Sequence, residues 1–213
     1  MPQGLTARIA AHVAKVANTP LAPEDTEALR RLVLDNAIVS LWGSTRPVTR
    51  AVAEWSRRFA GTGPCPVLGA DWTAEASVAA LVQGTAGHAY ELDDTHDVTA
   101  SHPGCVLIAA ALAEGTAQGS DQKALFRALA AGYEAMALIG ATSGGLETVH
   151  RGFHPTPVFG AFGAATACLA LQAQARGEAL APEALVTAWG LALSMPNGSM
   201  QFSVETTGGE IKR

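Results

Sequence analysis

The sequence contains few charged residues, few aromatic residues and very little lysine. Of its 213 residues, 15% are charged and 6% are aromatic, the formal net charge is -5, and only three residues are lysine. A protein that binds a nucleic-acid backbone needs a patch of Lys and Arg, and this chain offers none. We therefore expect no nucleic-acid partner.

Cysteine is also scarce, and its three occurrences form no pattern. Cys65, Cys105 and Cys168 stand alone in apolar surroundings, which predicts buried thiols in a reducing compartment instead of a disulfide framework or a zinc site. A catalytic thiol is the minor alternative. No His-x-x-x-His or Glu-x-x-His pair is expected on one helix face, so we predict a site without a metal ion and without a cofactor.

The N-terminus lacks the basic region and unbroken apolar core of a signal peptide. Arg8, His12 and Lys15 interrupt the apolar residues between positions 5 and 16, so we expect a cytoplasmic protein. Residues 155–175 carry no charge and are long enough to cross a membrane. The prolines, glycines and glutamines of this stretch favour a buried helix in close contact with its neighbours, and no membrane partner is expected.

The pattern of apolar residues is helical throughout. No segment alternates between apolar and polar residues, and no repeat of fixed period is present. Ala and Gly are prominent, as is typical of closely packed helices. We predict one all-α domain over residues 1–213, with two small domains as the alternative. Prolines, caps such as Thr73, and glycines place helices near residues 5–16, 23–42, 47–60, 73–90, 103–117, 120–139, 157–175 and 182–194.

Five of the six histidines lie in two short stretches. The first stretch surrounds a polar interruption at residues 91–102, between two predicted helices. It contains His88, His96 and His102, together with the acidic residues Glu91, Asp93, Asp94 and Asp97. The second stretch contains His150 and His154. Crowded like charges raise carboxyl pKa values, which suits a group that transfers protons near neutral pH. The alternative is a solvated loop in which Asp93 and Asp94 cap the preceding helix.

His102 comes directly before Pro103, at the predicted start of a helix. Free amide donors and the helix dipole favour an anion at such a position, so we expect a substrate carboxylate to bind there. His12 has no such context and is expected on a helix surface.

Residues 93–97, Asp-Asp-Thr-His-Asp, also match the Asp-Asp-x-x-Asp magnesium motif of α-helical isoprenoid synthases. The match is short, and those enzymes require a second metal-binding element and cations for the diphosphate. Residues 197–205 do not keep the spacing of such an element. A magnesium-dependent isoprenoid synthase is therefore the weaker alternative.

Several further motifs follow one another along the chain. They are His-Ala-Tyr-Glu-Leu-Asp-Asp-Thr at 88–95, His-Pro-Gly at 102–104, Gly-Tyr-Glu at 132–134, Arg-Gly-Phe-His-Pro-Thr at 151–156 and Gly-Gly-Glu-Ile-Lys-Arg at 208–213. In this order they resemble the MmgE/PrpD family, which includes 2-methylcitrate dehydratase, cis-aconitate decarboxylase and iminodisuccinate epimerase. Several motifs in the right order are far more specific than any one of them.

The resemblance implies an all-helical domain joined to a smaller α+β lid domain, a dimer, no metal, and an active site between the two domains. The residues that it assigns to proton transfer are Asp93 or Asp94, with His102 or His154 as partner. The residues that it assigns to the substrate are Thr95, His102, His154, Lys212 and Arg151. Arg151 is alternatively a loop anchor, and Tyr133 and Glu134 are expected to hold their helix in place.

Two positions depart from the family pattern: Leu138 stands where an Arg is usual, and Ala109 where a Pro is usual. The chain also ends near the point where the lid domain would begin, so we expect a truncated enzyme or one completed by a second chain. The expected activity is that of a metal-independent lyase of a small polycarboxylate, similar to 2-methylcitrate dehydratase. Alternatives are cis-aconitate decarboxylase-like or iminodisuccinate epimerase-like activity, or a non-catalytic helical binding subunit.

Overall fold

Helices form almost all of the regular structure, as predicted. The computed structural model describes residues 4–195 and 198–200. Within these ranges the helices are α1 (Leu5–Asn18), α2 (Pro23–Gly43), α3 (Pro47–Ser56), α4 (Ala76–Gly87), α5 (Pro103–Gln118), α6 (Gln122–Thr142), α7 (Glu147–His150), α8 (Pro155–Ala175) and α9 (Pro182–Ala192). A 3-10 turn, η1 (Arg57–Phe59), follows α3, and the strands β1 (Cys65–Pro66) and β2 (Thr73–Ala74) pair in antiparallel orientation.

Sequence signals at the helix ends explain many of these boundaries. Proline is the first residue of α2, α3, α5, α8 and α9, where its missing N–H costs no hydrogen bond. Asp121 caps α6, because its side chain accepts a hydrogen bond from the Ala124 amide. Gly119 ends α5 with a φ of 64°, a left-handed conformation that glycine adopts without strain.

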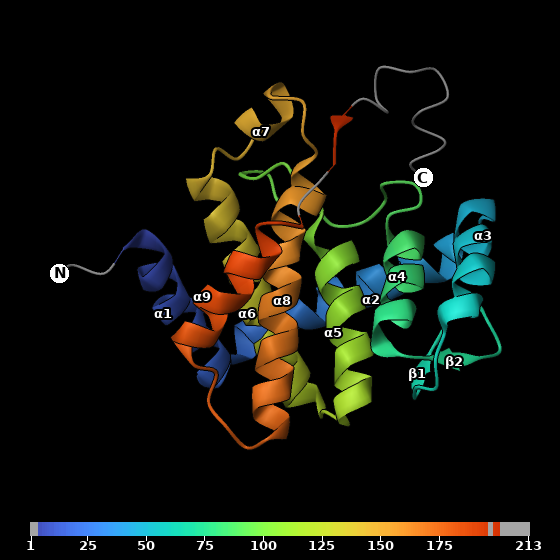
Figure 1. Ribbon diagram of the computed structural model, residues 1–213, viewed down its shortest axis with the longest axis horizontal. Helices are drawn as coiled ribbons and strands as arrows, with labels where there is room; N and C mark the ends of the chain where they lie inside the picture. Colours follow the sequence, from blue (N-terminus) through green and yellow to red (C-terminus); the bar gives the residue numbers. More distant parts are fainter. Residues whose placement is uncertain (1–3, 196–197, 201–213) are drawn as a thin grey trace.

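Helices α5, α6 and α8 pack against one another at the centre of the fold (Figure 1). Small residues let their backbones approach closely: a Cβ at Gly163 would lie 2.9 Å from the carbonyl oxygen of Gly132 and 2.6 Å from a methyl of Leu107. On one flank of this core lie α1 and α9, and on the other lies α4 with α2 and α3 (Figure 1). The Ala- and Gly-rich composition therefore serves close helix packing.

Two of the central helices, α6 and α8, are long and apolar enough to cross a membrane by length and composition. They pack against each other in the core, and core helices of soluble proteins pass the same test. The close packing predicted for residues 155–175 is observed in α8, so its length carries no argument for a membrane span.

The structure corrects several predicted boundaries. Thr73 does not cap a helix but lies in β2, and α4 begins at Ala76. A pairing of only two residues on each strand leaves no alternating pattern in a sequence, which is why the small sheet was missed. The short helix α7 ends at His150, the first residue of the second histidine stretch, and α8 begins at Pro155, two residues earlier than predicted.

Three helix ends meet where α4 stops and where α5 and α8 start. A histidine occupies the capping position of each: His88 follows α4, His102 precedes α5 and His154 precedes α8. The same His-Pro pair begins both α5 and α8. Helix packing thus brings together three histidines from separate parts of the chain.

Candidate active site

The side chains of His88, His102 and His154 form a cluster of imidazoles. The ring centroid of His88 lies 4.8 Å from that of His102 and 5.8 Å from that of His154. The rings of His102 and His154 are parallel, and their centroids are 6.4 Å apart. The Thr156 hydroxyl accepts a hydrogen bond of 2.9 Å from the His102 amide, which ties the start of α5 to α8. Because two helices begin here, their dipoles favour negative charge at the cluster.

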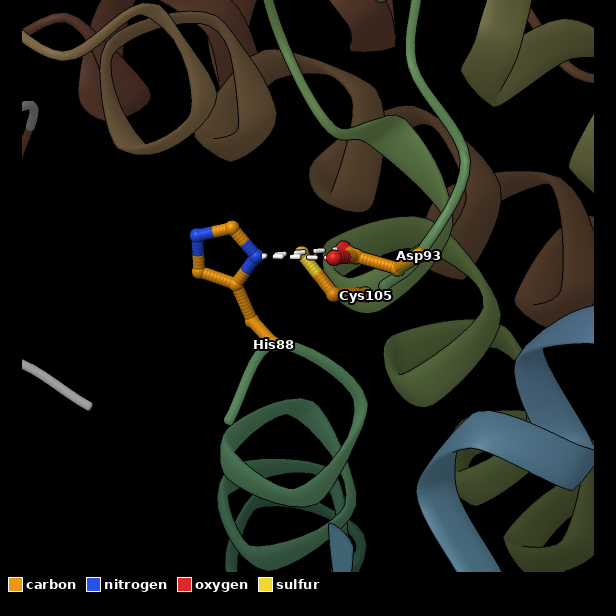
Figure 2. Close-up of side chains that lie close together, drawn as sticks. All are labelled: His88, Asp93 and Cys105. Carbon is orange, nitrogen blue, oxygen red and sulfur yellow. Dashed lines mark hydrogen bonds and ion pairs between the residues drawn. The ribbon is translucent and has the colours of Figure 1, made fainter. Parts of the chain in front are cut away.

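Asp93 supplies the carboxylate of this cluster. Its side chain has no exposed surface, and its Oδ1 lies 3.1 Å from His88 Nδ1 (Figure 2). The same oxygen lies 3.5 Å from His102 Nδ1. Burial alone would raise the pKa of Asp93, but the hydrogen bond with His88 and the charges of His88 and His102 lower this pKa below its ordinary value. The raised pKa predicted from crowded carboxylates is therefore wrong for Asp93.

The ionised Asp93 also determines how His88 is oriented. A carboxylate only accepts hydrogen bonds, so His88 Nδ1 is the donor of the pair. The other ring nitrogen, Nε2, is buried and has no hydrogen-bond partner among the described residues. In a neutral ring this nitrogen carries a lone pair, which makes His88 a candidate base held in place by Asp93.

Asp94 has different partners from its neighbour. Its Oδ1 accepts a hydrogen bond of 2.7 Å from the Gly104 amide, and its Oδ2 accepts one of 3.0 Å from the Tyr133 hydroxyl. Burial raises the pKa of Asp94, although these two hydrogen bonds oppose the rise. A carboxylate of the protein itself thus accepts the hydrogen bond of an amide at the start of α5, where the sequence predicts that a substrate carboxylate binds.

Tyr133 and Glu134 contact other protein groups, in agreement with the expectation that they hold their helix in place. The hydroxyl of Tyr133 bonds to Asp94, and burial raises the pKa of Tyr133, so that it keeps its proton. The Oε1 of Glu134 lies 2.7 Å from Nε2 of His12 and joins α6 to α1. His12 is 53% exposed, as predicted for a helix-surface residue.

The remaining predicted substrate ligands do not join the cluster in the described structure. Thr95 is exposed on the loop after α4. The side chain of Arg151 is 67% exposed, and its Nε lies 4.0 Å from Oε1 of Glu147, in the manner of a loop anchor. Lys212 lies outside the described residues. Of the predicted site residues, the structure therefore brings together Asp93, His102 and His154.

Two histidines of the predicted stretches also lie apart from the cluster. Nδ1 of His96 is 2.7 Å from the Thr99 hydroxyl within its own loop. His150 lies on α7, and its Nδ1 is 3.1 Å from Oε2 of Glu147, one helical turn earlier. The expectation that no Glu-x-x-His pair shares a helix face is therefore wrong, although the side chains of Glu147 and His150 are both exposed.

The two departures from the family pattern have different surroundings. Leu138 is partly buried and packs against the hydrophobic core, where a charged Arg would lack water. Ala109 is 2% exposed on α5, and it lines a groove beside the histidine cluster.

The loop acids do not converge as a magnesium motif would require. Asp93 faces His88, Asp94 bonds to Gly104 and Tyr133, and Asp97 is exposed. Since the carboxylates have separate partners, this arrangement gives no support to the isoprenoid synthase alternative.

Sequence reasoning did not assign His88 and Cys105 to the site. Donor atoms of His88, Asp93 and Cys105 lie within 4.8 Å of one another, a set that a zinc-like ion can bind (Figure 2). The Cys105 thiol donates to the His102 carbonyl oxygen at 3.2 Å, and burial together with Asp93 raises its pKa well above the ordinary value. The sequence feature that could have indicated Cys105 was its spacing, since it follows His102 by one helical turn.

These features define a helical domain in which an acid and several imidazoles meet at the ends of three helices. Residues 7–212 match the model of the MmgE/PrpD N-terminal domain, and the chain belongs to this family. It is 27% identical to a cis-aconitate decarboxylase-like protein, oryM, of Aspergillus oryzae, over 100% of this chain and 44% of that protein. It is 26% identical to a cis-aconitate decarboxylase of Aspergillus terreus, over 99% of this chain and 42% of that protein. The chain thus spans less than half the length of the curated relatives it matches.

Proposed function

We propose that the chain forms the helical part of a metal-independent lyase that acts on a small polycarboxylate, in the manner of a 2-methylcitrate dehydratase. The observation that carries this proposal is the buried carboxylate of Asp93 against His88, with His102 and His154 beside them at the starts of two helices. The family and the lyase names of the relatives support the reaction class.

The chemistry requires a base, an acid and positive groups. Removal of a proton next to a carboxylate needs a positioned base and stabilisation of the enolate-like charge that develops. Asp93 holds His88 through Nδ1, which leaves Nε2 to accept the substrate proton. His102 in its protonated form returns a proton to the leaving hydroxyl, and His154 binds a substrate carboxylate.

The sequence did not decide whether Asp93 or Asp94 takes part in proton transfer. We assign it to the pair of Asp93 and His88, and we assign to Asp94 the positioning of the α5 start, because its oxygens are engaged by Gly104 and Tyr133. Thr95, Arg151 and Lys212 are proposed to bind the substrate as well. A homodimer and a lid domain, on the same or on a separate chain, belong to the same proposal.

The names of the relatives favour a second candidate, a cis-aconitate decarboxylase-like activity. The same groups suit it: the imidazoles hold the carboxylates that stay, and a histidine supplies the proton that the carbon skeleton takes up as carbon dioxide leaves. The two candidates differ in the bond that breaks and not in the residues that this chain contributes.

Turnover of 2-methylcitrate and of cis-aconitate in the presence of EDTA tests the proposal. The measurement uses the full-length enzyme or the chain supplied with a lid-domain chain. We expect activity with one of the two acids, a loss of at least about 100-fold in Asp93→Asn and His102→Ala, and normal activity in the control His12→Ala. A strict requirement for magnesium contradicts the proposal. Tight binding without turnover in every combination identifies a non-catalytic binding subunit instead.

A further inference from the structure

A groove begins at the histidine cluster and runs over α5, between α4 and α8, which lie on either side of α5 in Figure 1. Its volume is about 430 Å³, which is within the range of small-molecule sites. His88 and His154 belong to its lining, so the groove is continuous with the candidate active site.

Small side chains create this groove. Ala80 and Gly84 on α4, Ala109 on α5 and Ala164 on α8 line it. A Cβ at Gly84 would lie 3.0 Å from the Cys105 carbonyl oxygen and 3.7 Å from the Ala109 Cβ, because α4 and α5 approach closely there. Helix packing therefore sets the floor of the groove, and a larger side chain at one of these positions would fill the space above it.

The chemistry of the groove changes along its length. At the histidine end the lining is polar and includes His88, His154 and the buried Thr156. The rest of the described lining is uncharged, and Ala, Leu, Val and Pro predominate in it. Such walls offer water few hydrogen bonds and favour an apolar group of a ligand. The matching ligand has acid groups at one end and hydrocarbon at the other.

Building on the proposed function, we propose that the substrate is a polycarboxylate with an unbranched hydrocarbon substituent, and that this substituent lies in the groove while the carboxylates bind at the histidine cluster. The helix between Ala80 and His88 spans about 12 Å at 1.5 Å per residue. The groove therefore has room for a substituent of several carbons. Ala80, Ala109 and Ala164 then determine the size of substituent that the enzyme accepts.

Calorimetry of the full-length enzyme, or of the chain supplied with a lid-domain chain, tests this proposal with succinate and with 2-alkylsuccinates of increasing length, because the acid end stays constant. We expect the affinity to rise about two- to fourfold for each added methylene until the groove is filled. In Ala80→Leu the rise disappears while the affinity for succinate is unchanged. The matched control Ser77→Leu, at an exposed position of the same helix, keeps the rise.

The outcomes distinguish the groove from the proposed function. If succinate binds and tail length has no effect, the groove proposal is overturned and the proposed function stands. If none of the acids binds, both are overturned. If Leu81→Glu dissociates a dimer of the chain and tail length has no effect, the groove is an interface between two copies, and the proposal is overturned.

Discussion

Two His–carboxylate pairs in this protein have the same separation and different surroundings. His88 Nδ1 lies 3.1 Å from Asp93 Oδ1, and His150 Nδ1 lies 3.1 Å from Glu147 Oε2. The side chains of the first pair are 16% and 0% exposed, and those of the second are 65% and 54% exposed. Water screens the exposed pair, whereas burial strengthens the interaction of the other and keeps its geometry fixed. Burial and neighbours, and not distance, therefore distinguish the candidate site.

The largest expected effect comes from replacing the histidine of each pair, which tests directly whether the buried and the exposed pair differ in function. In the full or complemented enzyme, His88→Gln is expected to lower kcat/KM by at least about 100-fold, since a positioned base contributes about 10²- to 10⁴-fold. His150→Gln, the matched variant of the exposed pair, is expected to stay near the wild-type kcat/KM. Equal losses in steady-state assays would show that burial does not separate the two pairs.

The next largest effect is expected at the neighbouring, partly buried carboxylate of Asp94. Gly104→Ala places a methyl group against the Asp94 oxygen that accepts the Gly104 amide hydrogen bond. We expect the free energy of unfolding, measured by urea denaturation, to fall by about 1–3 kcal/mol. The control Gly115→Ala on the same helix has its nearest neighbour at 3.6 Å, and it should leave stability unchanged or raise it. Equal losses would rule out contact with Asp94 as the cause.

A smaller loss should follow removal of one hydroxyl. Tyr133→Phe deletes the hydrogen bond to Asp94 Oδ2 and is expected to lower the free energy of unfolding by about 1–2 kcal/mol. The other tyrosine of the chain supplies the control, because Tyr90 is 47% exposed. Thermal or urea unfolding of Tyr90→Phe should match the wild type. A stable Tyr133→Phe would mean that Asp94 is held without the phenol.

The smallest effect is expected at the exposed pair of Glu147 and His150. Glu147→Gln removes the charge that faces His150 and Arg151, and we expect a change in the free energy of unfolding of less than about 0.5 kcal/mol. Salt should reduce the difference further, because ions screen exposed charges. A loss of several times this size in urea denaturation at high salt would show that the α7 pair is not a solvated surface contact.

The fold was predictable wherever its signals are local. Pro103 and Gly119 mark the two ends of α5, and Asp121 caps α6, because each residue acts on the backbone beside it. The pairing of β1 with β2 was not predictable, since it joins two residues on each strand across a loop. The short α7 was missed for a similar reason, because one helical turn has no period.

The candidate site was predictable in its members and not in their roles. Asp93 and Asp94 are adjacent and chemically equivalent in the sequence. In the fold one carboxylate contacts His88 and the other contacts Tyr133 and Gly104. Their pKa values consequently shift in opposite directions, which the crowding of acids in the loop could not indicate. Cys105 escaped attention because a lone cysteine in an apolar helix is typical of a core residue.

By itself the sequence determined the all-α class, the proline-marked starts of the helices and the ordered motifs of the MmgE/PrpD family, because these depend on local backbone preferences and on residue identity. Only the tertiary structure decided that His88 joins His102 and His154, that His150 stays at the surface, and that a small-residue groove leads away from the cluster. The physical reason is that burial and contact depend on how distant helix ends pack, and packing is a property of the whole chain.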